Sequence, residues 1–188
     1  MSFVNGFQRT AVFISGSGSC LQTLLDLSEF QNISLVITNK KSALGVLRAR
    51  RFGVEVLVMN SQMNFDQIHQ ILKMKGIQKI FLAGFMKIIP ESFLSLWTSH
   101  IFNIHPSLLP QFKGLHAFES AFETNKDIGV TIHHVTSEMD GGEIVLQQVS
   151  SKANEKLTKS ESQVLLRRTE QSLVREFIYK GSILCTRF

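Results

Sequence analysis

The chain has 188 residues, of which 44% are hydrophobic and 19% are charged, and only 3 are proline. This composition excludes a disordered or low-complexity protein and predicts one globular domain over residues 1–188, able to bury roughly 70% of its unfolded surface. The formal net charge is +5, but the basic residues are scattered without interleaved aromatic residues. We therefore expect anionic small-molecule substrates and no nucleic acid.

The two cysteines, Cys20 and Cys185, lack metal-ligand spacing, which predicts reduced thiols and a cytoplasmic location. Residues 1–15 contain no apolar signal-peptide segment, and no apolar run approaches the roughly 18 residues of a membrane span. We therefore expect no membrane partner.

Short apolar runs alternate with amphipathic stretches through the first two thirds of the chain, a pattern typical of βαβ units in a mostly parallel, doubly wound α/β sheet. Strands are predicted at Thr10–Ser15, Ser34–Thr38, Glu55–Val58, Lys79–Ala83 and His100–Ile104. Helices are predicted at Cys20–Leu27, Ser42–Phe52, Phe65–Met74 and Leu115–Asn125.

The last third of the chain predicts two more strands and a long helix. The strands cover Gly129–Val135 and Ile144–Val149. Thr158 and Glu161 have the spacing of a capping box, which predicts the start of the helix. Its apolar stripe consists of Val164, Leu165, Leu173, Phe177 and Ile178.

An amide and an imidazole stand at the end of the fifth predicted strand. Asn103 and His105 are two residues apart, so a strand places both side chains on one face. Ligands bind beyond the carboxyl ends of parallel strands. An amide donor beside a histidine that can carry a proton is suited to hold a developing oxyanion. This pair predicts acyl-type transfer chemistry.

A carboxylate commonly orients such an imidazole. Asp140 is the best-placed acid because the two glycines after it let the backbone come close to a site, although an Asp-Gly pair by itself more often marks a turn. His116, His133 and His134 are weaker candidates, since adjacent histidines in a strand face opposite ways. The sequence contains no H-x-x-x-H pair, the spacing that would indicate a metal site.

The turn from Ser15 to Ser19 consists of serine and glycine and leads into a predicted helix. Small residues let backbone N–H groups approach a phosphate, and a helix N-terminus adds roughly half a positive charge. The alternative is a plain strand-to-helix turn. Ser19 and Gln22 have the spacing of a second capping box.

The apolar segment Gly84–Pro90 follows the fourth predicted strand. Its backbone groups could meet a flat heterocycle between Met86 and Ile88. The alternative is core filling before a helix that begins near Pro90.

Five segments, in their order and spacing, resemble the folate-dependent phosphoribosylglycinamide formyltransferases of purine biosynthesis. They are Ile14–Ser19, Leu82–Met86, Asn103–Pro110, Gly114–His116 and Met139–Gly142. The resemblance implies the formyltransferase fold with a Rossmann-like N-terminal half. It also implies 10-formyltetrahydrofolate as cosubstrate, phosphoribosylglycinamide as acceptor and no metal. We expect a monomer or homodimer.

The resemblance also implies roles for individual residues. His105, Asn103 and Asp140 would form the catalytic set, while the residues that bind phosphoribosylglycinamide would be Gly18, Ser19, Cys20 and Glu170. Glu170 matches an acid that the family directs at the amino group of the substrate. The folate-binding residues would be Met86, Lys87, Ile88, Ile89 and Asn103. Cys20 departs from the asparagine usual in the family, which removes one side-chain donor beside the phosphate.

The implied reaction is direct attack of the glycinamide amine on the formyl carbon at N10 of the folate. The Asn103 amide and a protonated His105 would hold the oxyanion, and Asp140 would keep His105 charged. Two alternatives stay open. One is another 10-formyltetrahydrofolate enzyme, a methionyl-tRNA formyltransferase or a deformylase, which usually carries an additional domain. The other is a folate- or nucleotide-binding protein without activity.

Overall fold

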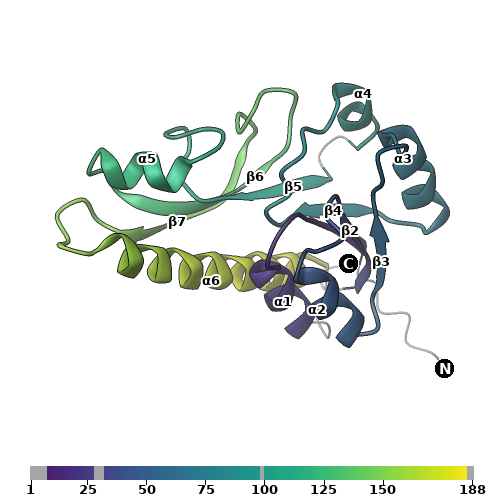
Figure 1. Ribbon diagram of the computed structural model, residues 1–188, viewed down its shortest axis with the longest axis horizontal. Coiled ribbons are helices and arrows are strands. Elements are labelled where there is room, and N and C mark those ends of the chain that lie inside the picture. The colour runs from purple at the N-terminus through teal and green to yellow at the C-terminus, as the bar shows by residue number, and fades with distance from the viewer. Residues whose placement is uncertain (1–7, 28–31, 98–99, 186–188) are drawn as a thin grey trace.

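The computed structural model describes residues 8–27, 32–97 and 100–185, and Figure 1 shows their arrangement. The strands are β1 (Arg9–Ile14), β2 (Asn32–Thr38), β3 (Glu55–Val58), β4 (Lys79–Leu82), β5 (Ile101–His105), β6 (Ile128–His134) and β7 (Ile144–Ser151). The helices are α1 (Ser19–Asp26), α2 (Gly45–Arg51), α3 (Phe65–Met74), α4 (Glu91–Leu94), α5 (Ala117–Glu123) and α6 (Lys159–Cys185), with a short 3₁₀ helix at Ser95–Trp97.

All the described strands form one sheet in the order β3-β2-β1-β4-β5-β6-β7. The neighbours from β3 to β5 are parallel, whereas β6 runs antiparallel to β5 and β7 antiparallel to β6. The chain crosses from β1 outward to β3 and then returns to β4, which puts a switch in strand order between β1 and β4. The predicted doubly wound, mostly parallel α/β fold is confirmed.

Helices cover both faces of the sheet. Along β1, Val12 and Ile14 belong to a buried cluster with α1, α2 and α6, whereas Ala11 and Phe13 belong to a second cluster with α3 and α4. Figure 1 shows α6 beside α1 and α2 on one side of the sheet, with α3 and α4 on the other. This division follows from the alternation of side chains along a strand.

The predicted strands are all present, with ends within two residues of the expected ones. The predicted helices are present too, although α2 begins at Gly45 rather than Ser42, because the residues before it form tight turns such as Ala43 N–H to Lys40 C=O. Thr158 and Glu161 form the predicted capping box of α6. A short helix, α4, begins directly after Pro90, as expected.

Two details of the sequence interpretation are wrong. Ser19 does not cap α1: the N-cap is Gly18, in a left-handed conformation with φ 71°, and no side chain caps the helix. Val164 is not in the apolar stripe of α6, since it is 45% exposed. The buried apolar positions of α6 begin at Leu166 instead and continue through Leu173 to Ile178.

Candidate functional site

Polar side chains of β5 and β6 gather on the face of the sheet that is turned away from α6. Phe102 contacts Phe177 of α6 with ring centroids 5.0 Å apart, so Asn103 and His105 face the other way. β6 places His133 directly opposite Asn103. The structure therefore brings Asn103 and His105 to one face, as the strand period predicts, and adds His133 to them.

The ring of His133 is in contact with the Asn103 amide. Nδ2 of Asn103 lies 3.2 Å from Nε2 of His133. The other ring nitrogen, Nδ1, lies 2.8 Å from the carbonyl oxygen of His134. A carbonyl oxygen only accepts, so Nδ1 carries a proton. Nε2 accepts from Asn103 when the ring is neutral, and it donates to Asp140 when the ring is doubly protonated. His133, a weaker candidate by sequence, thus belongs to the site.

Asp140 reaches this group from the loop between β6 and β7. Its carboxylate oxygens lie 3.4 Å from Nδ1 of His105 and 3.5 Å from Nε2 of His133, and one of them accepts the Gly114 N–H at 2.8 Å. Burial by itself raises the pKa of Asp140, but hydrogen bonds from His133 and Gly114 and the charges of the two histidines lower the pKa to about 2. Asp140 is therefore ionised at neutral pH.

His105 lies between two hydrogen-bond acceptors. Its Nδ1 faces the Asp140 carboxylate, and its Nε2 lies 2.9 Å from the carbonyl oxygen of Phe112. The side chain is buried, with the residue 5% exposed. Only the doubly protonated ring donates to both oxygens, so this environment is complementary to an imidazolium.

The segment Gly16–Gly18 forms a tight turn between β1 and α1. Gly18 adopts a left-handed conformation, and a Cβ atom there would come within 2.7 Å of Cα of Gly45. The first turn of α1, which begins at Ser19, carries no acidic side chain. No carboxylate of the helix itself therefore competes for the backbone N–H groups at its start, which suits an anion.

Cys20 and Glu170 meet at this turn. The Cys20 thiol lies 4.0 Å from a carboxyl oxygen of Glu170, which comes from α6. Burial raises the pKa of Glu170 to about 7, although the charge of Arg167 opposes the rise. Burial and the nearby Glu170 raise the pKa of the Cys20 thiol, which stays protonated at neutral pH. Glu170 thus lies beside the start of α1, next to the turn between β1 and α1.

The segment after β4 lies at the carboxyl ends of the parallel strands, next to Ser15, which follows β1. The Met86 N–H donates to Oγ of Ser15, and the Ser15 N–H donates to the carbonyl of Gly84, at 2.8 and 3.1 Å. Met86 and Ile88 are 62% and 78% exposed. Lys87 is exposed and Ile89 half-buried. Hydrogen bonds thus hold this apolar, solvent-facing segment against the turn after β1.

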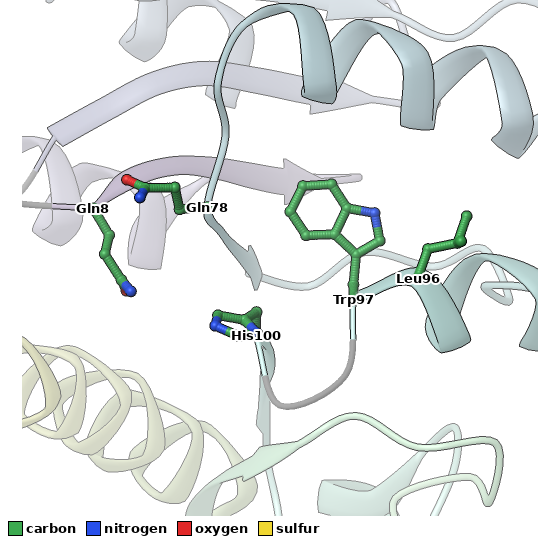
Figure 2. Close-up of a pocket in the computed structure, with 5 residues that line it drawn as sticks. All are labelled: Gln8, Gln78, Leu96, Trp97 and His100. Atoms are coloured by element: carbon green, nitrogen blue, oxygen red, sulfur yellow. The ribbon is translucent and has the colours of Figure 1, made fainter.

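A separate pocket opens at the opposite edge of the sheet. It is lined by Gln8, Gln78, Leu96, Trp97 and His100 (Figure 2). Gln8, Gln78 and His100 directly precede β1, β4 and β5, so the pocket lies at the amino ends of these strands. Substrates of open parallel sheets bind beyond the carboxyl ends. We therefore do not assign this pocket to the site chemistry.

Among the residues that the structure describes, no group of three His, Cys, Asp or Glu side chains is placed to hold a metal ion. Within the same part of the chain, no helix combines the length and the apolar character needed to cross a membrane.

Comparisons with known proteins agree with this arrangement. The chain matches the family model described as formyl transferase over residues 8–178. It belongs to the formyl transferase family. It is 38% identical to the phosphoribosylglycinamide formyltransferase of Haemophilus influenzae over 152 residues, which cover 74% of this chain and 71% of that protein. The enzyme of the same name from Escherichia coli is 38% identical over 148 residues, 72% of this chain and 69% of the other.

A human relative is much longer than this formyl transferase. The chain is 40% identical over 158 residues to the trifunctional purine biosynthetic protein adenosine-3 of Homo sapiens. The match covers 78% of this chain but spans only 16% of the length of that protein.

Solved structures share the fold. The glycinamide ribonucleotide transformylase 1 of Symbiobacterium toebii superposes with a TM-score of 0.87 at 32% identity, covering 97% of this chain and 91% of that one. The phosphoribosylglycinamide formyltransferase of Anaplasma phagocytophilum gives a TM-score of 0.83 at 36% identity, with 88% and 82% covered. The resemblance drawn from the five sequence segments is confirmed.

Proposed function

We propose that this formyl transferase is a phosphoribosylglycinamide formyltransferase, which moves the formyl group of 10-formyltetrahydrofolate to the amino group of phosphoribosylglycinamide in purine biosynthesis. The observation that carries the proposal is the contact group of His105, Asp140, His133 and Asn103 in a chain 38% identical to two curated enzymes of that name. An amide donor, an imidazole and a carboxylate are what addition to a formyl carbonyl needs.

The catalytic set is His105, Asn103 and Asp140. The acceptor amine attacks the formyl carbon, and the carbonyl oxygen becomes an oxyanion that takes hydrogen bonds from the Asn103 amide and from Nε2 of His105. In this structure, Nε2 of His105 lies against the Phe112 carbonyl. The segment around Phe112 therefore moves away when Nε2 donates to the substrate. The Asp140 carboxylate keeps the proton on Nδ1 of His105.

Collapse of the tetrahedral intermediate completes the transfer. The bond from the former formyl carbon to N10 of the folate breaks, and the oxyanion returns to a carbonyl. The proton lost by the amine ends on N10, carried by water next to His105. Atoms and charges balance without a metal ion.

Residues on the other strand ends bind the two substrates. Gly18, Ser19 and Cys20 hold the phosphate of the acceptor through backbone N–H groups at the start of α1. The contact between Glu170 and Cys20 supports a role for Glu170 on the same ribonucleotide. The folate lies along the segment after β4, on the residues Met86, Lys87, Ile88 and Ile89, with Asn103 beside them.

Formyl transfer measured directly tests the proposal. The native chain and its His105→Ala variant are assayed with 10-formyltetrahydrofolate and phosphoribosylglycinamide, following loss of the formyl-folate and appearance of the formylated acceptor. We expect acceptor-dependent turnover that falls on the order of 100- to 1000-fold in the variant, the usual cost of losing one oxyanion donor. Acceptor-independent release of formate by the native chain would identify a deformylase, and binding without turnover a non-catalytic relative.

We also propose that the enzyme acts in the cytoplasm, as a single domain in a monomer or homodimer, on small molecules without nucleic-acid or membrane partners. The free, buried Cys20 thiol supports a reducing compartment. Sedimentation of the purified chain tests the oligomeric state, and a fluorescent fusion tests the location.

A further inference from the structure

Residues of helix α2 donate two hydrogen bonds to the turn between β1 and α1. The Gly45 N–H, at the start of α2, donates to the Gly16 carbonyl at 3.2 Å. One turn further along α2, Nε of Arg48 donates to the Ser17 carbonyl at 2.9 Å. Two successive carbonyls of the turn are thus bound by residues of the next βα unit.

These two contacts set the direction of the backbone N–H groups. In a planar trans peptide, the carbonyl of one residue and the N–H of the next point in opposite directions. Binding the Gly16 and Ser17 carbonyls to α2 therefore turns the N–H groups of Ser17 and Gly18 away from α2. Those two N–H groups add to the first N–H groups of α1, which a helix leaves without intrahelical partners.

Arg48 also connects the turn to α1. Its Nη1 donates to Oε1 of Gln22 at 3.0 Å, while Nε2 of Gln22 donates to Asp26 at 2.7 Å. Arg48 is half-buried, whereas its neighbours Arg50 and Arg51 are exposed. A planar guanidinium with donors in a fixed fork can hold a carbonyl and an amide oxygen at once, which a lysine ammonium does less well.

We propose that Arg48 is a positioning residue for the phosphate of the acceptor: by holding the Ser17 carbonyl, it aims the turn's backbone N–H groups at the anion. This rests on the proposed function, which places the phosphate at this turn. Arg48 acts through Ser17 and Gln22 rather than by contact with the reacting atoms. Its loss therefore weakens binding of the ribonucleotide and spares the chemical step.

Substitution of Arg48 separates this role from the effect of charge alone. We expect Arg48→Met to raise the KM for phosphoribosylglycinamide on the order of 10-fold or more, as a lost charge-assisted hydrogen bond predicts, with kcat and the KM for the folate unchanged. Arg48→Lys keeps the charge and one donor, so it should recover part of the affinity. Arg50→Met removes the same charge from an exposed position of α2 and should leave the three constants unchanged.

Inorganic phosphate is the second probe, and it needs no turnover. Titration of the native chain and Arg48→Met by calorimetry should show weaker phosphate binding in the variant by a similar factor. An equal change in Arg50→Met would overturn the proposal in favour of general charge. A fall in kcat and in thermal stability, together with a rise in both KM values, would show a structural role instead. Failure of the native chain to turn over the acceptor would refute the proposed function, while the phosphate titration would still test Arg48.

Discussion

Nδ2 of Asn103 lies 3.2 Å from Nε2 of His133, and this contact determines which way the Asn103 amide points. Because Nδ1 of His133 donates to the His134 carbonyl, the neutral ring accepts at Nε2 and holds the nitrogen side of the amide. The same Nε2 lies 3.5 Å from Asp140, so a ring protonated there donates to the carboxylate and gives up the amide. The neutral form of His133 is thus the one that keeps Asn103 as a donor.

The first prediction concerns this ring. His133→Phe fills similar space but leaves the half-buried Asn103 amide without its acceptor, which costs up to about 3 kcal/mol. We expect kcat to fall on the order of 10- to 100-fold while the KM for the folate changes little. His134→Phe is the matched control, since His134 faces the other side of β6 and contacts Phe102. Steady-state kinetics check both variants, and equal losses in the two would contradict the role of His133.

The raised pKa of Glu170 predicts that the stability of the fold depends on pH. Burial raises the pKa of Glu170 from an ordinary value of 4.5 to about 7, so the folded protein holds this proton more tightly than the unfolded chain. A carboxyl with a raised pKa stabilises the fold below pH 4.5 relative to neutral pH, and this stability is lost as the pH rises through about 7. Glu170→Gln removes the dependence. The melting temperature of the native chain should therefore fall relative to that of Glu170→Gln between pH 5 and pH 7.5, and parallel curves would refute the prediction.

Replacing Cys20 with asparagine is expected to increase the affinity for phosphoribosylglycinamide. Its thiol is buried and protonated and is a weak donor, whereas an asparagine amide offers two good donors beside the proposed phosphate site. We expect Cys20→Asn to lower the KM for phosphoribosylglycinamide by roughly 3- to 10-fold, the effect of one net hydrogen bond, with kcat unchanged. Cys20→Val lacks the donors and controls for loss of the thiol. Equal KM values for the two variants would count against a phosphate at this turn.

Substitution of Gly142 is expected to lower both the free energy of unfolding and the activity. A Cβ atom at Gly142 would collide with the backbone carbonyl of His134, whereas one at Gly16 would meet nothing within 4 Å. Gly142→Ala should lower the free energy of unfolding by about 1–3 kcal/mol, the cost of overpacking, and should reduce kcat because Asp140 lies two residues away. Gly16→Ala serves as the control for stability alone. Urea unfolding checks both, and an unaffected Gly142→Ala would show that the loop moves freely.

Much of the fold could be predicted because it depends on local patterns. The apolar runs and their spacing identified the strands from β1 to β7, and the period of two placed Asn103 and His105 on one face. The interval between Thr158 and Glu161 located the start of α6. Each of these features needs only the properties of neighbouring residues in the chain.

The features that were missed depend on contacts between distant segments. His133 joins the site because β6 pairs with β5 in one particular register, which the sequence of β6 does not contain. The N-cap of α1 is Gly18, where a side chain does not fit because a Cβ atom would come within 2.7 Å of Cα of Gly45. The phase of α6 depends on how the helix lies on the sheet, so the stripe begins at Leu166 and leaves Val164 in solvent. No local signal could have shown these arrangements.

The loop that carries Asp140 is closed at its base by a backbone hydrogen bond. The His134 N–H donates to the Glu143 carbonyl at 2.9 Å, and the adjacent Val135 N–H donates to the Ile101 carbonyl of β5, also at 2.9 Å. Because this hydrogen bond fixes the two ends of the loop, adding or deleting one residue between them would move Asp140 out of reach of both His105 and His133. We therefore expect the length of this loop to be fixed, because the number of its residues is itself part of the geometry that brings Asp140 to the two histidines.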